Sequence, residues 1–249
     1  MSPASRRHAA AVTFALAALA AGLVAPQGMA APQHGLVPGP PGRDAAWTAR
    51  LISPVAALSA PVSGRLIERQ SDFGSWSGGP VQLLVLSTRT GSDGQLWLRV
   101  LLPLRPNGTS AWIPAASTNL RPTAWRIVIS TERRTVSVFQ NGNRLRTFRA
   151  VVGAPKTPTP HGQFAVYEHA PLADPKGFFG PWALHLTALS NALRRYDGGP
   201  GRIAIHGRGG ASLRDPLGTA RSHGCIRISN AAIRFLAAHV PDGAPVEVR

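Results

Sequence analysis

Apolar and polar residues alternate over two neighbouring stretches in the second half of this chain. Residues 126–130 (RIVIS) and 135–140 (TVSVFQ) both show the alternation that is typical of strands with one buried face. The pair Asn141-Gly142 follows directly and favours a tight hairpin turn, which leads into an apolar segment at residues 145–153. We therefore predict a β-meander at the start of the second half.

More strands and one helix follow this meander. Short apolar runs predict strands over residues 164–167, 182–186, 202–206 and 245–249. Apolar residues recur at helical spacing in residues 230–239 (NAAIRFLAAH), where Ser229 or Asn230 can cap the start and Pro241 with Gly243 ends the helix. The predicted fold is mainly β with one clear C-terminal helix.

The first half of the chain has shorter apolar runs between turn signals. Strand character is found in residues 47–58, 81–87, 96–103 and at Trp112 and Ile113. Residues 64–80 are rich in Gly and Ser, and they predict turns. We predict a small all-β module over residues 47–120, which resembles bacterial SH3-like modules through LWLRVLLPLRPNGTSAWI. The alternative is a β extension of the domain that follows.

The N-terminus has the three parts of a secretory signal peptide. Arg6 and Arg7 precede an uncharged, mostly apolar run at residues 9–25, and small residues follow. We predict a signal peptide over residues 1–30 and a flexible, Pro- and Gly-rich lead over residues 31–46. The protein is therefore expected to be extracytoplasmic, in the cell wall or periplasm, and an uncleaved membrane anchor is the alternative.

The charge of the chain is strongly positive. The 249 residues carry a formal net charge of +16, almost wholly from arginine. Arginine- and alanine-rich usage is also typical of a GC-rich genome, but a basic surface favours polyanions whatever its origin. For an exported protein, acidic cell-wall polymers are the natural partners, and no nucleic-acid-binding motif is present.

The chain contains one cysteine, Cys225, in the stretch RSHGCIRIS. It could be a buried structural thiol, a partner for another chain, or a nucleophile. His223 lies two residues earlier, so in an extended segment both side chains would point to the same face. Gly224 between them permits a backbone turn that other residues resist.

A second histidine, His206, ends a predicted strand and is followed by Gly207. It precedes Cys225 by 19 residues, across a Gly-rich loop that can fold back. A thiol with an imidazole in reach is what covalent acyl transfer needs, and an imidazole or a helix N-terminus nearby would stabilise the thiolate. Zinc binding by His206, His223 and Cys225 is an alternative that lacks a fourth ligand.

Together these residues resemble the L,D-transpeptidase (YkuD-like) catalytic domain, a family of peptidoglycan cross-linking enzymes. The resemblance covers residues 125–249. It is carried by His206 and Gly207, by Pro158, Thr159, Pro160 and Gly162, and by Ser222, His223, Gly224, Cys225, Ile226 and Arg227. Residues 167–185 (YEHAPLADPKGFFGPWALH) match no residue of the family pattern, so the walls of the donor site are left open.

The resemblance implies a β-sandwich catalytic domain with a cysteine nucleophile and no cofactor or metal. Cys225 would attack the carbonyl of the third residue of a donor stem peptide, and the thioester would pass to an amine of an acceptor stem, giving a 3-3 cross-link in cell-wall biogenesis and maintenance of cell shape. His206 would be the general base, and His223 an orienting or oxyanion-side group.

The remaining residues of the motif have supporting roles in this interpretation. The backbone amides of His223, Gly224 and Cys225 are candidates for the oxyanion hole. Arg227 would brace the loop or meet a substrate carboxylate, Ser222 would hydrogen-bond within the loop, and Gly207 would support His206. Two other functions stay open: an L,D-carboxypeptidase or other Cys/His wall-peptide hydrolase, and a non-catalytic wall-binding protein. The sequence leaves the oligomeric state open.

Overall fold

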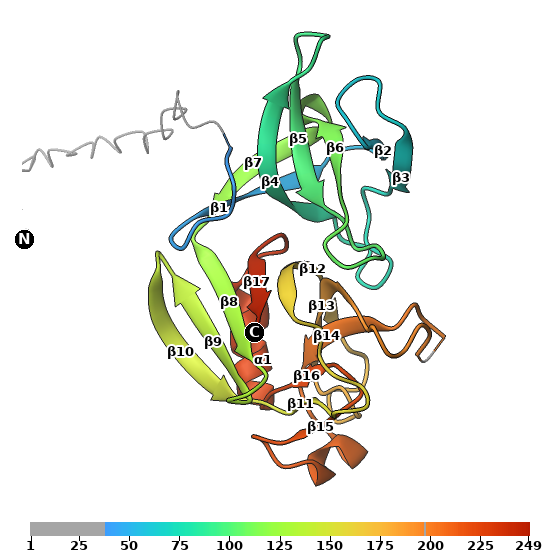
Figure 1. Cartoon of the computed structure of the whole chain (residues 1–249). Helices are drawn as coiled ribbons and strands as arrows, with labels where there is room; N and C mark the ends of the chain where they lie inside the picture. Colours follow the sequence, from blue (N-terminus) through green and yellow to red (C-terminus); the bar gives the residue numbers. More distant parts are fainter. Residues whose placement is uncertain (1–37, 197) are drawn as a thin grey trace, which may run out of the picture. The chain divides into compact units, whose positions relative to one another are not determined.

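The computed structural model describes residues 38–196 and 198–249, which form two main β-sheets (Figure 1). The predicted signal peptide, and residues 31–37 of the predicted lead, lie outside this part of the chain. The first sheet, called here the N-terminal sheet, has the strand order β3-β2-β6-β5-β4-β1-β7. Its strands are β1 (Ala46–Leu51), β2 (Val55–Leu58), β3 (Leu66–Gln70), β4 (Gln82–Thr90), β5 (Leu96–Leu101), β6 (Ser110–Pro114) and β7 (Thr118–Thr123).

The second sheet, called here the C-terminal sheet, has the order β10-β9-β8-β17-β12-β13-β14-β16. Its strands are β8 (Trp125–Ser130), β9 (Thr135–Gln140), β10 (Asn143–Arg149), β12 (Gly162–Pro171), β13 (Trp182–Leu189), β14 (Arg202–His206), β16 (Ile226–Arg227) and β17 (Pro245–Val248). A separate parallel pair joins β11 (Val152–Gly153) to β15 (Ala220–Ser222). Short 3-10 helices cover Ala115–Ser117 and Gly210–Arg214, and the α-helix α1 covers Asn230–His239.

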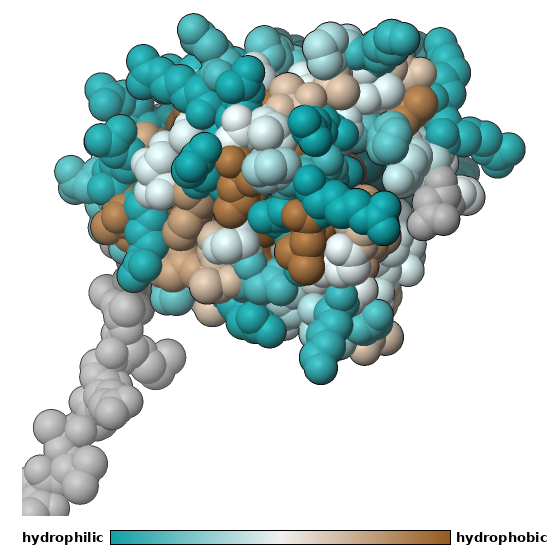
Figure 2. Space-filling model, turned by 90° about the horizontal axis from the view of Figure 1, so that it is seen from below, coloured by the Kyte–Doolittle hydropathy of each residue, from teal (hydrophilic) through white to brown (hydrophobic). Residues whose placement is uncertain are grey.

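The predicted meander is the β8–β9–β10 edge of the C-terminal sheet. Asn141 and Gly142 have φ values of +48° and +73°, so both central residues of the hairpin turn take the conformation that Asn-Gly favours. The edge strand β10 exposes most of its side chains, including Arg144 and Arg146. Charged side chains on an edge strand disfavour pairing with another sheet. Hydrophilic residues likewise cover most of the face shown in Figure 2.

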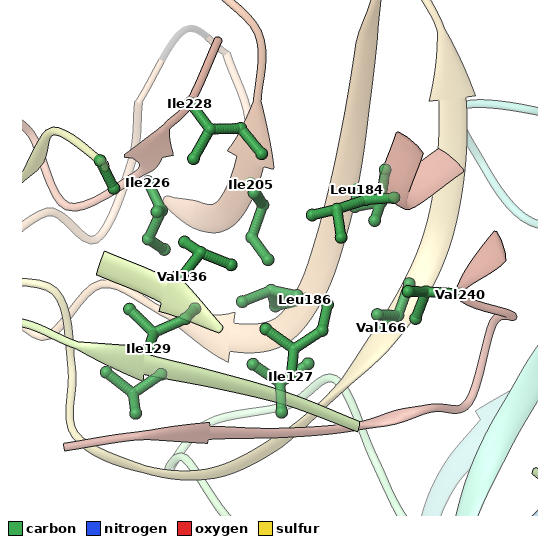
Figure 3. Packing of buried hydrophobic residues seen from close by; sticks show 14 of the residues in the cluster. Ile127, Ile129, Val136, Val166, Leu184, Leu186, Ile205, Ile226, Ile228 and Val240 are labelled. Carbon is green, nitrogen blue, oxygen red and sulfur yellow. The ribbon is translucent and has the colours of Figure 1, made fainter. Parts of the chain in front are cut away.

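The helix α1 has the bounds that the sequence predicts. The Ser229 side chain caps it by accepting a hydrogen bond from the Ala232 backbone N–H at 3.2 Å. Its apolar side packs Ile233 and Leu236, both fully buried, into the core of the C-terminal sheet. Figure 3 shows this core, in which side chains from β8, β12, β13, β14 and β16 converge. The core fixes the ends of β14 and β16, where the motif residues lie.

The mainly β fold with one C-terminal helix is confirmed, and the apolar segment at residues 47–58 forms two strands, β1 and β2. One detail of the first half was predicted wrongly. The stretch at residues 64–80, predicted as turns, contains β3. Only one residue of its sequence LIERQ is buried, and β3 is an edge strand that pairs only with β2. An edge strand with few buried side chains gives little apolar signal.

The two sheets share apolar contacts through β12. Tyr167 belongs to the core cluster of the N-terminal sheet, and Ala165 packs with Leu84 and Leu101 of that sheet. Between residues 38 and 249, position 197 aside, no helix is both long enough and apolar enough to cross a bilayer.

Candidate active site

The end of β14 and the start of β16 bring the predicted site residues together. The two strands run parallel, with Ile205 opposite Ile226 and His206 opposite Arg227. Cys225 directly precedes β16, so it lies beside the end of β14. His206, His223, Cys225 and Arg227 all line one narrow cavity of about 20 Å³. The structure therefore brings both histidines and the thiol to one cavity at an edge of the C-terminal sheet.

A tight loop of residues 222–225, called here the SHGC loop, presents the thiol. Gly224 has a φ of +114°, which disfavours any residue with a side chain, and a Cβ there would lie 2.9 Å from Ile203 Cδ1. Ser222 Oγ accepts a hydrogen bond from the Gly224 N–H at 3.1 Å and donates to the Cys225 carbonyl at 2.5 Å. Ser222 therefore makes the expected bonds within the loop. Because the Gly224 amide is engaged there, the amides of His223 and Cys225 remain the oxyanion-hole candidates.

The loop that contains the Pro-Thr-Pro pattern is hydrogen-bonded to the SHGC loop. Thr159 is 3% exposed, and its hydroxyl donates to the Gly224 carbonyl at 2.8 Å while accepting from the Gly153 N–H at 3.0 Å. Thr157 Oγ1 donates to the Ser222 carbonyl at 3.0 Å. The sequence singled out the Pro-Thr-Pro pattern but gave it no role. The structure makes Thr159 the residue that holds the backbone next to the thiol.

His206 is buried, at 1% exposure, and its tautomer is set by the backbone. Its Nδ1 lies 2.8 Å from the Gly207 carbonyl, which can only accept, so Nδ1 carries the proton and Nε2 has the free lone pair. The rings of Phe178 and Phe179 flank the imidazole, with centroids 6.3 and 5.0 Å away. Burial lowers the pKa of His206 to about 4, although the bond to Gly207 opposes this. The imidazole is therefore neutral, and available as a base, at neutral pH.

The thiol of Cys225 is held protonated rather than as a thiolate. Burial is the main influence and raises the pKa of Cys225, outweighing the opposing effects of a backbone hydrogen bond with Ala204 and the charge of Arg227. Its sulfur lies 3.9 Å from the Arg202 carbonyl, an acceptor that favours the neutral S–H. The expectation that a nearby imidazole or helix N-terminus would stabilise the thiolate is therefore wrong for this state of the site. His206 is itself neutral and cannot supply the needed charge.

Arg227 in β16 is buried and forms an ion pair with Asp215, in the Gly-rich loop between β14 and β15. It is 4% exposed, and its Nη1 lies 2.5 Å from Asp215 Oδ2. Its guanidinium carbon also lies 4.8 Å from the centre of the Phe178 ring. Of the two roles considered from the sequence, the ion pair with Asp215 favours bracing. Asp215 was not predicted, because a single aspartate in a Gly-rich loop carries no distinctive pattern.

His223 lies at the mouth of the site. Its side chain is exposed and its ring centre is 5.6 Å from that of Tyr196. The position suits an orienting contact with an incoming substrate better than a proton relay to the buried His206.

A wider cavity of about 220 Å³ shares Cys225 with the narrow cavity. Its walls include Phe179, His185, Tyr196 and Arg202, and also Trp76 from the loop between β3 and β4. The sequence predicted none of these residues. Phe179 and His185 come from residues 167–185, the segment that matched nothing in the family pattern. Burial lowers the pKa of His185 to about 4, so this side chain is neutral as well.

The part of the chain that the structure describes contains no group of three or more His, Cys, Asp or Glu side chains placed to hold a metal ion.

Comparison with known proteins identifies the family. The model of the YkuD L,D-transpeptidase catalytic domain matches residues 124–248. Over 124 residues, 50% of this chain, the sequence is 32% identical to the YkuD protein of Bacillus licheniformis and 29% identical to that of Bacillus subtilis. The match spans 65% of the length of each of these relatives.

A solved L,D-transpeptidase from Mycobacterium tuberculosis is similar over 80% of this chain and 94% of its own, with 16% identity and a TM-score of 0.43. The family match contains the SHGC loop, His206 and the Pro-Thr-Pro loop. This chain belongs to the YkuD family of L,D-transpeptidase catalytic domains.

Proposed function

We propose that the protein is an extracytoplasmic cysteine L,D-transpeptidase that forms 3-3 cross-links in peptidoglycan through a thioester on Cys225. The observation that carries this proposal is the paired geometry of His206 and Cys225. Both side chains line one cavity, and the bond from Nδ1 to the Gly207 carbonyl leaves Nε2 as the basic nitrogen. A nucleophile with a tautomerically fixed base is the arrangement that acyl transfer uses.

The reaction begins with a neutral thiol and a neutral imidazole. As Cys225 Sγ bonds to the carbonyl carbon of the third stem residue, Nε2 of His206 takes the thiol proton. The amide bond to the terminal D-residue then breaks, and the imidazolium gives its proton to the departing amine. The product is a thioester on Cys225 and a free D-amino acid. Since the pKa of His206 is lowered by burial, the imidazolium is short-lived and returns its proton readily.

In the second half-reaction an acceptor amine attacks the thioester. His206 accepts a proton from the amine, a new amide bond forms, and the sulfur leaves and is reprotonated. The amides of His223 and Cys225 stabilise the oxyanion in both half-reactions, where one such donor contributes about 3 kcal/mol. Thr159 holds the loop that carries these amides, and Arg227 ties the strand that follows it to Asp215.

Peptidoglycan stem peptides are the proposed donor and acceptor. The N-terminal sequence pattern supports export, and the formal charge of +16 supports retention near anionic wall polymers. Contacts of this kind between exposed charges weaken as salt is added.

Purified tetrapeptide muropeptides, with product masses as the readout, test the proposal. We expect dimers that lack one terminal D-residue with the parent protein, and none with Cys225→Ala. Tripeptide monomers without dimers would instead establish an L,D-carboxypeptidase, in which water resolves the thioester. Unchanged muropeptides with both proteins would contradict the enzymatic proposal and favour a wall-binding role.

A further inference from the structure

We propose that the N-terminal sheet supplies part of the substrate site, and that Trp76 contacts the donor peptide and determines how tightly it binds. This inference rests on the proposed function. It begins from the cavity of about 220 Å³, in which Trp76 and Cys225 both form part of the wall. Trp76 comes from the loop of residues 71–81, called here the Trp76 loop, which joins β3 to β4 and lies outside the family match.

The Trp76 loop is fixed to the C-terminal sheet by one buried carboxylate. Glu168 in β12 is 3% exposed, and its Oε1 accepts hydrogen bonds from the Trp76 N–H at 2.8 Å and from the Ser77 N–H at 2.5 Å. The Ser77 hydroxyl donates to the same oxygen at 2.8 Å. Gly74 packs so closely that a Cβ there would collide with this carboxylate. Charge-assisted bonds from a buried acid hold a loop more firmly than contacts between neutral groups.

The Trp76 ring is also held in place, by contacts with two side chains. It stacks on the His185 ring, with centroids 4.1 Å apart and planes 14° from parallel. Arg202 lies against the same indole, its guanidinium carbon 5.4 Å from the ring centre. The Arg202 carbonyl is in turn the acceptor next to the Cys225 sulfur, so Trp76 is two contacts from the nucleophile.

The indole nevertheless keeps a large free surface. Trp76 is 44% exposed, while its backbone is bonded to a buried acid and one ring face is covered. Apolar surface that is held rigidly at the edge of a cavity is the usual mark of a binding contact. Aromatic side chains such as Trp carry a large share of binding energy at such sites, because little entropy is lost when they bind.

The connection between β5 and β6 of the N-terminal sheet also bonds to the loop that carries Tyr196, another residue of the cavity wall. Arg105 donates to the carbonyls of Ser190 at 2.7 Å and Pro200 at 3.0 Å, close to the two ends of the loop that carries Tyr196. Asn107 exchanges two hydrogen bonds with the Leu189 backbone, at 2.8 and 2.9 Å. Arg105 and Asn107 are therefore positioning residues for Tyr196. Both of these parts of the cavity wall depend on a sheet that precedes the family domain.

The test compares Trp76→Ala with Phe73→Ala and Trp76→Phe in the full chain. Phe73 lies in the same loop and is 59% exposed, but it does not line the cavity, so it is the matched control. With a tetrapeptide donor we expect Trp76→Ala to raise KM about tenfold, which corresponds to about 1.4 kcal/mol of binding free energy, with kcat nearly unchanged. Trp76→Phe should restore most of the affinity, and Phe73→Ala should match the parent. An equal rise in KM for Phe73→Ala, or no rise for Trp76→Ala, would overturn the inference.

A second readout separates this inference from the proposed function. Cys225 is the only cysteine, so its labelling by iodoacetamide and by a bulky fluorescein maleimide can be timed directly. Removing the indole should speed the bulky reagent relative to the small one, whereas Phe73→Ala should leave the ratio unchanged. If the parent shows no turnover but the ratio of the two labelling rates changes as expected, the proposed function is wrong and the place of Trp76 in the cavity wall is supported. If turnover occurs and neither KM nor this ratio responds to Trp76→Ala, only the proposed role of Trp76 is wrong.

Discussion

The hydroxyl of Thr159 donates a hydrogen bond of 2.8 Å to the carbonyl of Gly224, the residue directly before Cys225. Both groups are shielded from water, and the same hydroxyl accepts from the Gly153 N–H. The Pro-Thr-Pro loop therefore fixes the peptide plane between Gly224 and Cys225. That plane carries the Cys225 amide, one of the two oxyanion-hole candidates.

Replacing Thr159 with valine keeps the shape of the side chain and removes both hydrogen bonds. Because the buried Gly224 carbonyl and the half-buried Gly153 N–H lose their partner, we expect the free energy of unfolding to fall by about 1–3 kcal/mol. Turnover should fall more than stability alone explains, since the Cys225 amide is no longer held. Urea denaturation and initial rates at a temperature where the variant is fully folded measure the two effects. Thr147→Val, which removes an exposed bond to Ser137, should change neither.

The ion pair between Arg227 and Asp215 predicts that Asp215→Ala lowers stability much more than Arg221→Ala does. Asp215→Ala leaves the guanidinium of Arg227 buried without its partner, and removing one member of such a pair costs about 3–5 kcal/mol. Arg221 also approaches Asp215, at 4.0 Å, but its side chain is 61% exposed. We therefore expect Arg221→Ala to cost less than about 1 kcal/mol in the same denaturation experiment. Equal losses for the two variants would contradict the bracing role of Arg227.

The two buried histidines make stability depend on pH. The pKa of both His206 and His185 is lowered to about 4, below the ordinary value of 6.5, so the unfolded chain takes up protons first as the pH falls. The contribution of each histidine to the free energy of unfolding is fully present above about pH 6.5. It falls by about 1.4 kcal/mol per pH unit as the pH is lowered from about 6.5 to about 4. His185→Gln should remove one of these two contributions.

Urea midpoints for the parent and His185→Gln, measured at intervals between pH 4 and 8, check this prediction. The two proteins should show the same pH dependence from pH 7 to 8 and should diverge below pH 6.5, where the parent loses stability faster. Parallel curves over the whole range would show that His185 is not buried in its neutral form.

The raised pKa of Cys225 predicts how the thiol reacts with a small probe. Since the thiolate is scarce at neutral pH, the rate of alkylation by iodoacetamide should climb steadily with pH, without a plateau below pH 9. His206→Gln should abolish transfer from peptide donors but keep this rising profile, because the imidazole acts during the reaction with peptide. A plateau with a midpoint near pH 6 would instead indicate a stored thiolate–imidazolium pair.

The parts of the fold and site that follow from short segments could be predicted from the sequence. The β9–β10 hairpin, the capped helix α1 and the strand that ends at His206 each depend on neighbouring residues. The SHGC loop likewise contains its own turn residue, Gly224, together with Cys225. The sequence pattern singled out His206 and Cys225 as a pair, but the parallel pairing of β14 and β16 that brings them to one cavity was not predicted.

Contacts between distant segments could not be predicted in this way. Trp76 is held at the cavity by hydrogen bonds to Glu168, and Arg105 bonds to the backbone of Ser190 in the loop that carries Tyr196. Neither contact leaves a periodic pattern in the sequence. The state of the thiol was also misjudged. Neighbouring residues suggested a stabilised thiolate, but the burial of Cys225 depends on the packing of β14 and the loops around it.

Trapping the covalent intermediate tests the central claim most directly. The protein would be mixed with a tetrapeptide donor whose own amines are blocked by acetylation, without any other acceptor amine, quenched in acid within seconds, and weighed intact by mass spectrometry. The account predicts a species heavier than the protein by the mass of the donor minus its terminal D-amino acid, mapped to Cys225 and absent from Cys225→Ala. Turnover of the donor without such a species, or the same adduct on Cys225→Ala, would contradict a thioester on Cys225.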